Sequence, residues 1–303
     1  MKKFLMGYVA VALTVGFMTG TAVAQPASST LDKIKASGTV NLGVRDSSGL
    51  AYTIGNGKYV GFHTEMAERI VDDLSKQLGV PLKINYQLIT SQNRVPLVQN
   101  GTIDFECGST TNNLARQKDA AFAITTYVEE VRIATKAGSG IKSIEDLNGK
   151  TVATTTGTTS VQHLRKNERA KNIDFKEVYG KDHADSFLML ETGRADAFVM
   201  DGSILAANIA RSKNPAAYAI VGEVLSTEPI ACMLRKDDPK MKEAIDNSIK
   251  RQIKDGSLAK LWDKWFMQPT PPNNVNMNMP LSASTKAAWD NPNDKPMEEY
   301  GNK

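Results

Sequence analysis

The first hundred residues alternate between strand and helix patterns of apolar side chains. Val40–Val44 is a short apolar run that predicts a buried strand. A second strand is predicted by four apolar residues that alternate with polar ones: Leu82, Ile84, Tyr86 and Leu88. Between the strands, a helix with one apolar stripe is predicted by residues spaced four apart: Phe62, Met66, Ile70, Leu74 and Leu78. A short helix that Thr90 or Ser91 can cap should end before Gly101, and the alternation predicts an α/β sheet.

The rest of the chain repeats this strand and helix alternation. Thr151–Thr155 predicts a strand, and Gly157–Ser160 predicts the start of a helix. Residues 232–239 predict a strand that leads into a capped helix, with an irregular turn later at Gly256. From Gln268 the chain is rich in Pro, Asn and Met, which predicts an extended tail along the surface, disordered at its end.

Two stretches of the chain match each other when Gly101 is aligned with Gly193. The segments IDF and ADA then coincide, and Ser109 falls on Asp201. Each copy is a helix, a glycine turn and a strand that delivers a polar group at its end. Ligands of open α/β sheets bind at the carboxyl ends of strands, so two facing units would form a cleft. Coincidence between two ordinary strand and helix units is the alternative.

Ile103–Ala123 carries the strongest candidate chemistry. It predicts a strand, a Gly-Ser-Thr-Thr loop and a helix that carries Arg116. This order places hydroxyls, backbone N–H groups and a fixed cation around one point, and the arginine side chain suits a carboxylate. Gly157–Ser160 places similar donors at a second helix start. The sequence therefore predicts a protein that holds a small anion.

The segment 1–24 differs from the rest of the chain. Lys2 and Lys3 precede an apolar run, Phe4–Phe17, and the small residues AVA follow, which predicts a cleaved secretory signal peptide. A membrane anchor is the alternative, but the run is short and is interrupted by Gly and Thr. We therefore expect export to the periplasm, without a lipid anchor because no cysteine lies near the cleavage site.

Composition narrows the class of partner. The 303 residues are 41% hydrophobic and 23% charged, which is usual for a soluble globular protein, and the length fits two lobes. Loss of the signal segment reduces the 37 basic residues to 35, against 33 acidic residues. The sequence has no basic patch with interleaved aromatic residues, so we expect no nucleic-acid partner.

Cys107 and Cys232 are the two cysteines of the chain. In an oxidising periplasm two lone cysteines usually pair, and two free thiols are the alternative. Neither the cysteine spacing nor the three histidines predict a metal site, and we expect no cofactor.

Several motifs resemble those of solute-binding protein family 3, the periplasmic proteins that deliver polar amino acids to ABC transporters. The motifs are STLDKIKASGTV, TSQNRVPLVQNGTIDFECGSTTNNLARQKDAAF, TTGTTS, KDHADSF, CMLRKDDP, LWDKWF and PPNNVNMNM. The similarity runs from Ser29 to about Asp294, and the members that bind glutamate and aspartate are the most similar. The run from SQNR to RQ is long and specific.

The resemblance implies an α/β fold of the type II periplasmic-binding-protein class. Two lobes, each a mixed sheet flanked by helices, would be joined by hinge strands near Tyr127–Thr135 and Ser226–Met233. The implied division is a signal peptide, 1–24; lobe 1, 25–128 and 228–303; and lobe 2, 129–227. A discontinuous lobe 1 agrees with the internal match and with a disulfide between Cys107 and Cys232.

The resemblance also implies how an amino acid would be held. Arg116 would bind its α-carboxylate with two donors, assisted by Thr111 and Thr159. Asp201 and the region of Ser109 would hold the α-ammonium group.

A second carboxylate on the ligand would need cations of its own. Arg45, Arg94 and His183 are available, with Ser91 as a hydroxyl donor. So many charges need good hydrogen bonds to offset their desolvation. The alternatives are that Arg45 is a solvated loop residue, that Arg94 caps its helix and that His183 lies at the surface. We expect three further polar residues to have no role: His63 at the surface, His163 on a helix and Glu106 in a strand.

The implied function is capture of L-glutamate or L-aspartate by a monomer that docks to an ABC transporter permease. The alternatives are a periplasmic enzyme on the same scaffold, such as a dehydratase, a binder of a related amino acid such as glutamine, and a sensor input domain. Catalysis would need an acid or base with a perturbed pKa, for which His183 and Glu106 are the candidates. A site lined by arginines favours retention over turnover, so we expect no enzymatic activity and no catalytic residues.

Overall fold

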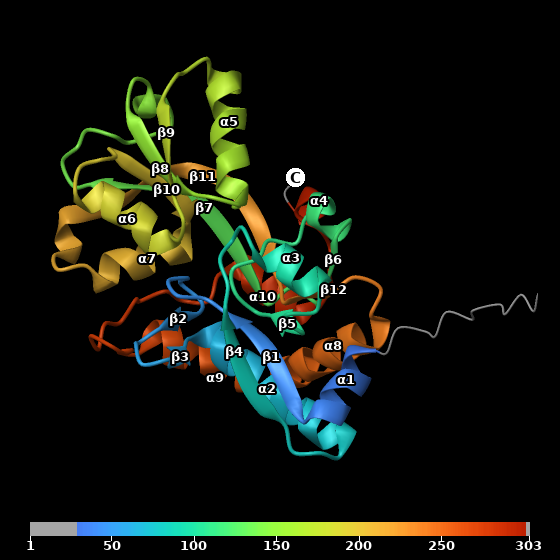
Figure 1. Ribbon diagram of the computed structural model, residues 1–303. Helices are drawn as coiled ribbons and strands as arrows, with labels where there is room; N and C mark the ends of the chain where they lie inside the picture. The colour runs from blue at the N-terminus through green and yellow to red at the C-terminus, as the bar shows by residue number, and fades with distance from the viewer. Residues whose placement is uncertain (1–28, 301–303) are drawn as a thin grey trace, which may run out of the picture.

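The computed structural model describes residues 29–300, which form two lobes, one above the other in Figure 1. The predicted signal peptide, 1–24, lies outside the described residues. No helix in the described part of the chain is long and apolar enough to cross a membrane. Each lobe contains a five-stranded mixed sheet flanked by helices, which confirms the predicted α/β architecture.

Lobe 1, the lower lobe in Figure 1, is built from both ends of the described chain. In sheet order its strands are β4 (Lys83–Leu88), β1 (Thr39–Val44), β5 (Phe105–Glu106), β12 (Met233–Arg235) and β6 (Ala120–Phe122). Strand β1 is parallel to β4 and β5, and β12 is antiparallel to β5 and β6. A small hairpin joins β2 (Tyr52–Thr53) to β3 (Tyr59–Val60). The helices are α1 (Thr30–Ser37), α2 (Phe62–Leu78), α3 (Arg94–Gln99), α4 (Leu114–Gln117), α8 (Pro239–Lys254), α9 (Ser257–Trp262), α10 (Ala283–Asp290) and α11 (Met297–Tyr300), with a π-helix at Asp263–Met267.

Lobe 2 is built from the middle of the chain. In sheet order its strands are β11 (Tyr218–Ile230), β7 (Tyr127–Lys136), β10 (Ala197–Asp201), β8 (Thr151–Thr155) and β9 (Lys176–Gly180). Strand β8 is parallel to β9 and β10, and β7 is antiparallel to β10 and β11. Its helices are α5 (Thr159–Lys171), α6 (His183–Glu191) and α7 (Gly202–Arg211), with short 3₁₀ turns at Glu145–Leu147 and Pro215–Ala217.

Two strands connect the lobes, as the resemblance implies. Strands β7 and β11 pair along their length, from Tyr127 opposite Ile230 to Lys136 opposite Tyr218. Figure 1 shows both strands extending from the lobe 2 sheet towards lobe 1. Residues near the lobe 1 end of this ribbon therefore belong to a hinge that is shared by both halves of the protein.

The periodic segments form the elements that their patterns predict. Helix α2 spans Phe62–Leu78 and buries its apolar stripe, and Val40–Val44 lies within β1. Helix α3 begins at Arg94, and Thr90 caps the turn that leads into it, as one of the two predicted caps. The Asn93 N–H donates to Thr90 Oγ1 at 3.3 Å, and the Thr90 N–H donates to Asn93 Oδ1 at 2.8 Å, which is the reciprocal pattern of a capping box. Ser91 is therefore not a helix cap and is free to face the cleft.

The internal match reflects shared geometry in the two lobes. In lobe 1 the Asp104 N–H donates to Asn41 O at 2.8 Å, and the Asp104 carboxylate accepts the Asn41 N–H at 2.7 Å. Asp196, the aligned residue in lobe 2, makes the same two bonds to Thr151, both at 2.8 Å. In each case the aspartate lies directly before its own strand and is bonded to a residue in the first half of a neighbouring strand.

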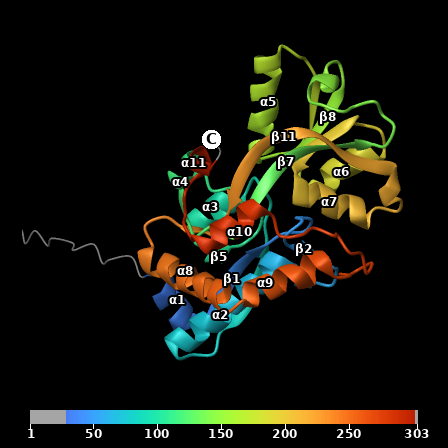
Figure 2. The same ribbon diagram turned by 180° about the vertical axis from the view of Figure 1, so that it is seen from behind.

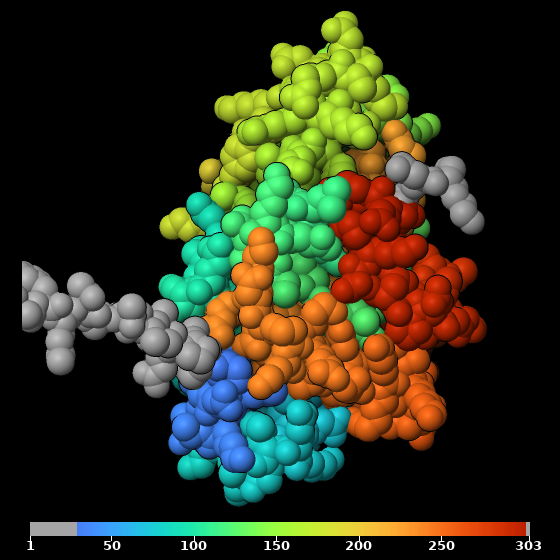
Figure 3. Space-filling model, turned by 90° about the vertical axis from the view of Figure 1, so that its right-hand side faces the viewer, coloured from blue at the N-terminus to red at the C-terminus, as the bar shows by residue number. Residues whose placement is uncertain are grey.

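The prediction of an extended tail is wrong beyond Leu281, where two helices follow, α10 and α11. The last three residues, 301–303, lie outside the described part of the chain. Helix α10 packs against β7 at the lobe 1 end of the hinge ribbon (Figure 2), and the red segment in Figure 3 covers one flank of the molecule. The Trp289 indole N–H donates to Thr126 O at 2.8 Å, and Thr285 Oγ1 accepts the Val128 N–H at 3.1 Å. The composition of the segment does not predict these two contacts, because their partners lie far away in the sequence.

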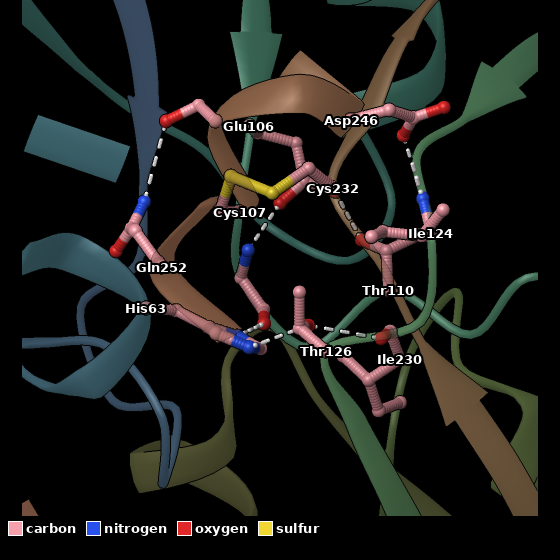
Figure 4. The surroundings of a disulfide bond; sticks show 12 residues. His63, Glu106, Cys107, Thr110, Ile124, Thr126, Ile230, Cys232, Asp246 and Gln252 are labelled. Atoms are coloured by element: carbon pink, nitrogen blue, oxygen red, sulfur yellow. Dashed lines mark hydrogen bonds between the residues drawn. A yellow bond between two sulfur atoms is a disulfide. The ribbon is translucent and has the colours of Figure 1, made fainter. Parts of the chain in front are cut away.

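The predicted disulfide between Cys107 and Cys232 is confirmed (Figure 4). The same view corrects the expectation that His63 lies at the surface. His63 is buried at the start of α2, with Nδ1 2.6 Å from Gly108 O and Nε2 2.9 Å from Thr126 Oγ1. Burial is the main cause that lowers the pKa of His63 to about 4, so the ring is neutral and structural at neutral pH.

Candidate functional site

Arg45 follows directly after β1 and is fully buried between the lobes. Its Nη2 donates to Ser91 Oγ at 3.0 Å and to His183 Nε2 at 2.9 Å. Its Nε and Nη1 atoms are buried and have no hydrogen-bond partner within residues 29–300. The alternative of a solvated loop residue is therefore wrong, and two guanidinium donors of Arg45 remain available to an acceptor.

His183 starts α6 and faces Arg45 from lobe 2, so the alternative of a surface residue is wrong. A guanidinium has no acceptor, so His183 Nε2 accepts from Arg45 and the ring hydrogen lies on Nδ1, 3.0 Å from Thr155 Oγ1. Burial, together with the charges of Arg45 and Arg94, holds the pKa of His183 well below its usual range. The prediction that His183 acts as a cation is therefore wrong, because its contacts are those of a neutral ring.

The lobes touch directly beside this pair. The Ser47 hydroxyl donates to the Asp182 carboxylate, and the Ala184 N–H donates to Ser47 Oγ at 3.0 Å. Asp182 Oδ2 also lies 3.6 Å from Arg45 Nη2. These bonds join the loop after β1 to the start of α6, so the structure holds the lobes in a closed arrangement.

Arg94 begins α3 and is also fully buried. Its Nη1 donates to Ser109 O at 3.2 Å and to Thr110 Oγ1 at 2.7 Å, whereas its Nε has no partner among the residues described. The pKa of Arg94 is lowered by burial and by the charges of Arg116 and Arg45. The alternative of a helix-capping residue is wrong, because the side chain points into the cleft and not back to its helix.

Glu106 is a residue whose role the sequence analysis missed. Its carboxylate accepts the Thr110 hydroxyl and the Gly108 N–H, the latter at 2.7 Å. Since Thr110 also accepts from Arg94, Glu106 orients that arginine through the threonine hydroxyl. A glutamate that directly follows a buried phenylalanine and precedes a Cys-Gly turn was the available signal.

Arg116 lies in the single-turn helix α4, which Asn113 caps by accepting the Arg116 N–H at 2.8 Å. Its Nη1 donates to Thr111 O at 2.8 Å, and its Nη2 reaches across to Gly157 O at 3.3 Å. Burial lowers the pKa of Arg116, and the charges of Glu228 and Asp201 oppose this effect. The guanidinium is thus held between the two predicted anion-binding segments.

Asp201 ends β10, and its side chain is buried. Burial and the charges of Glu129 and Glu228 raise the pKa of Asp201 well above its usual value. Glu129 is buried as well, and accepts from Ser203 and from its neighbour's N–H at 2.9 Å. Burial is the main cause that raises the pKa of Glu129 to about 7. A cation placed beside Asp201 would relieve this crowding of negative charge.

Thr111 and Thr159 meet at the centre of the site, with their hydroxyl oxygens 3.5 Å apart. Both hydroxyls donate to Glu228, which His163 also contacts at 2.8 Å through Nε2. The prediction that His163 has no role is wrong, and no sequence pattern indicates Glu228. Nothing in the local pattern pairs these residues, because they come from β11 and α5.

All the residues that the sequence analysis selected for ligand binding are brought together. The contacts above link Arg45, Ser91 and His183 into one group, Arg94 and Ser109 into a second, and Arg116, Thr111 and Thr159 into a third. Asp201 lies within electrostatic reach of Arg94 and Arg116. Guanidinium donors of Arg45 and Arg94 that lack a partner in the described part of the chain therefore lie near the buried carboxylate of Asp201, and this arrangement suits a small ligand that carries both charges.

Two α/β lobes that close about a hinge on a charged internal site define a ligand-binding protein of the type II periplasmic class. The chain belongs to the bacterial extracellular solute-binding proteins, family 3, whose model matches residues 40–268.

Individual relatives agree with this assignment. The chain is 44% identical over 297 residues to the glutamate/aspartate import solute-binding protein of Escherichia coli K12, covering 97% of this chain and 98% of that one. It is 40% identical over 291 residues to the L-glutamate/L-aspartate-binding protein of Pseudomonas aeruginosa, covering 95% and 96%. Among solved structures, a mutant of ArgBP from T. maritima superimposes with a TM-score of 0.68 at 31% identity, covering 78% of this chain and 98% of that one.

Proposed function

We propose that this protein captures L-glutamate or L-aspartate between its lobes and delivers it to an ABC transporter permease. One observation carries the choice of an acidic ligand. Three buried guanidinium atoms, Arg45 Nε, Arg45 Nη1 and Arg94 Nε, have no acceptor within the described chain. A second carboxylate would satisfy them, and the names of the 44% and 40% identical relatives support the same ligands.

Each part of the ligand has a proposed set of partners. Arg116 and the segments of Thr111 and Thr159 would bind the α-carboxylate, because donors from both lobes converge there. Asp201, with Ser109 nearby, would bind the α-ammonium group. Arg45 and Arg94 would bind the side-chain carboxylate, with Ser91 and neutral His183 orienting Arg45.

The proposal also covers the cellular location of the protein, its division into lobes and its oligomeric state. A periplasmic protein would lose residues 1–24 as a signal peptide. Lobe 1 would comprise 25–128 and 228–303, and lobe 2 would comprise 129–227. Such a two-lobe carrier would act as a monomer and present both lobes to the permease.

The site supports an enzymatic function less well than it supports ligand binding. The two catalytic candidates are engaged elsewhere: His183 accepts from Arg45, and Glu106 accepts from Thr110 and Gly108. Neither has a free acid or base position facing the cleft. We therefore propose a binding protein without catalytic activity.

Isothermal calorimetry on refolded, ligand-stripped protein tests this function with glutamate, aspartate, glutamine and succinate. Tight binding of glutamate or aspartate, with weak binding of glutamine and succinate, is the expected result. Glutamine binding as tightly as glutamate would remove the role of Arg45 and Arg94 in recognising a second carboxylate. Failure of all four to bind would favour the enzyme, and product assays would follow.

A charge-removing variant sharpens the test. We expect Arg94→Gln to weaken glutamate binding by about 100-fold or more, as expected for a charged group left without its partner, and to change glutamine binding little. Arg165→Gln is the matched control, because Arg165 lies on the outer face of α5 with a half-exposed side chain. Equal losses for glutamate and glutamine in Arg94→Gln would contradict the assignment.

A further inference from the structure

Glu228 occupies an unusual position at the lobe 1 end of the hinge ribbon. It lies on β11 directly opposite Glu129 on β7, and its side chain is fully buried. A buried carboxylate is costly unless its oxygens are well hydrogen-bonded. Its partners should therefore explain why the hinge carries this residue.

Both lobes supply donors to Glu228. Thr111 of lobe 1 donates its hydroxyl to Oε2, and Thr159 of lobe 2 donates its hydroxyl to the same oxygen at 2.8 Å. His163, one helical turn after Thr159 in α5, contacts Oε1 at 2.8 Å. The carboxylate thus holds the loop after β5 and the start of α5 against the hinge.

These bonds determine which donors remain for a ligand. A threonine hydroxyl carries one hydrogen, so a hydroxyl that donates to Glu228 cannot also donate to a bound carboxylate. The first N–H groups of α5 have no intrahelical partner and point from the helix start. Arg116 lies between Thr111 and Gly157, at the same point.

The charge of Glu228 is maintained in this setting. Burial raises its pKa, but the hydrogen bonds from His163, Thr111 and Thr159 outweigh burial, and the net pKa is lowered. The ionised carboxylate then accepts every donor that surrounds it. It also supports the positive charge of Arg116.

We propose that Glu228 is a positioning residue for ligand capture, which gathers Thr111, Thr159 and His163 when the lobes close. The two threonine hydroxyls serve Glu228, and the ligand α-carboxylate is left to Arg116 and to the backbone N–H groups at the start of α5. This inference rests on the proposed function and refines it. It assigns to the hinge a bond that slows reopening of the closed form.

A double-mutant cycle in ligand binding tests the role of the hydroxyl. Glu228→Gln keeps the volume of the side chain, and Thr159→Val removes the hydroxyl while keeping the backbone. We expect each variant alone to weaken glutamate binding by about 10- to 100-fold, mainly through faster dissociation. In the Glu228→Gln background, Thr159→Val should cost less than about threefold, and Thr159→Ser should restore binding in the native background. Additive losses would mean that the hydroxyl binds the ligand itself, which would overturn the proposal.

A measurement without ligand separates this inference from the proposed function. Small-angle X-ray scattering of the ligand-free protein should give a larger radius of gyration for Glu228→Gln than for the unaltered chain. Glu130→Gln is the control, since Glu130 lies on the same ribbon with a half-exposed side chain. An unchanged radius together with unchanged ligand dissociation would overturn the role of Glu228. If the unaltered chain binds no amino acid but the radius still differs, the proposed function fails and the hinge bond stands.

Discussion

Arg45 and His183 contact each other across the two lobes, with Arg45 Nη2 2.9 Å from His183 Nε2. Because the guanidinium can only donate, the contact requires a neutral ring. The imidazole is held in that tautomer by Thr155 Oγ1, 3.0 Å from Nδ1. The closed form therefore depends on a histidine that has lost its proton, which links ligand binding to pH.

Glutamate affinity should fall as the pH falls below about 6.5. In the closed form the pKa of His183 is well below its usual range, and when the lobes open the ring leaves Arg45 and its pKa returns towards about 6.5. Protons then bind the open form in preference, so affinity should fall by up to about tenfold per pH unit between 6.5 and 5. Calorimetric titrations across this range measure the slope.

His183→Gln provides the matched variant for this pH dependence. The amide oxygen can accept from Arg45 but does not titrate, so binding should persist at pH 7 and the slope should flatten. His183→Leu should weaken binding at every pH, because Arg45 loses an acceptor. A wild-type slope in the glutamine variant would assign the pH dependence to another group.

Glu129 should release protons when an amino acid binds. Its pKa of about 7 reflects burial and the neighbouring Glu228, so the carboxyl is partly protonated at neutral pH. An ammonium group beside Asp201 would favour the ionised forms of both acids, and roughly half a proton should leave Glu129 at pH 7. The buffer takes up the released proton, so the binding enthalpies measured in phosphate and in Tris should differ by roughly half the difference between the ionisation enthalpies of the two buffers.

The control for proton release is Glu129→Gln, in which the enthalpies in the two buffers should nearly agree. Asp201 also has a raised pKa, so a small difference should persist in this variant. Identical enthalpies in the unaltered protein would show that neither acid changes protonation, and Asp201 would no longer be a suitable site for the ammonium group.

The sequence was sufficient to predict elements whose pattern is local. Helix α2 follows from an unbroken four-residue repeat, and the strand at Thr151–Thr155 forms as predicted. The ligand residues were selected from the resemblance to the family, which rests on long motifs such as the one that carries Arg116. Local order along the chain was enough for the elements, but not for the ligand residues.

The features that were missed depend on pairs of residues far apart in the sequence. Glu228 contacts Thr111 and Thr159 only once β11 has paired with β7, so its role depends on the folded hinge. His63 looks like a surface residue in its own helix, and is buried because the loop at Gly108 folds over it. No periodicity within one segment reports such contacts.

His63 should make the protein less stable as the pH falls from about 6.5 to about 4. Its folded pKa of about 4 is below the unfolded value, so the unfolded chain binds the proton first and the unfolding free energy decreases with pH. The full difference corresponds to roughly 3 kcal/mol, of which about 2 kcal/mol should be lost between pH 6.5 and 5. Urea unfolding at a series of pH values measures this loss.

His63→Gln separates this effect from other titrating groups. The variant should be less stable at pH 7, because the glutamine amide does not reproduce both contacts of the ring, to Gly108 O and Thr126 Oγ1. Its stability should vary less with pH in the same range. The raised pKa of Glu129 acts in the opposite direction, adding stability as the pH falls below 7, and it is common to both proteins. Parallel pH profiles would show that His63 does not lose a proton on folding.

Trp289 should be a main anchor of the C-terminal segment, although the matched family region ends at residue 268. Its ring is buried in the lobe 1 core, packs edge-on against Trp262 at 6.4 Å and donates to Thr126 O at 2.8 Å. Trp289→Ala should therefore lower the unfolding free energy by about 3–5 kcal/mol, as is typical for a buried aromatic residue. Lys286→Ala on the exposed side of α10 should change it by less than about 0.5 kcal/mol, because its ion pair with Asp290 is exposed. Chemical unfolding of both variants decides the matter: similar small losses would mean that the tail only rests on the surface, and a large loss confined to Trp289→Ala would make it part of the core that holds the hinge.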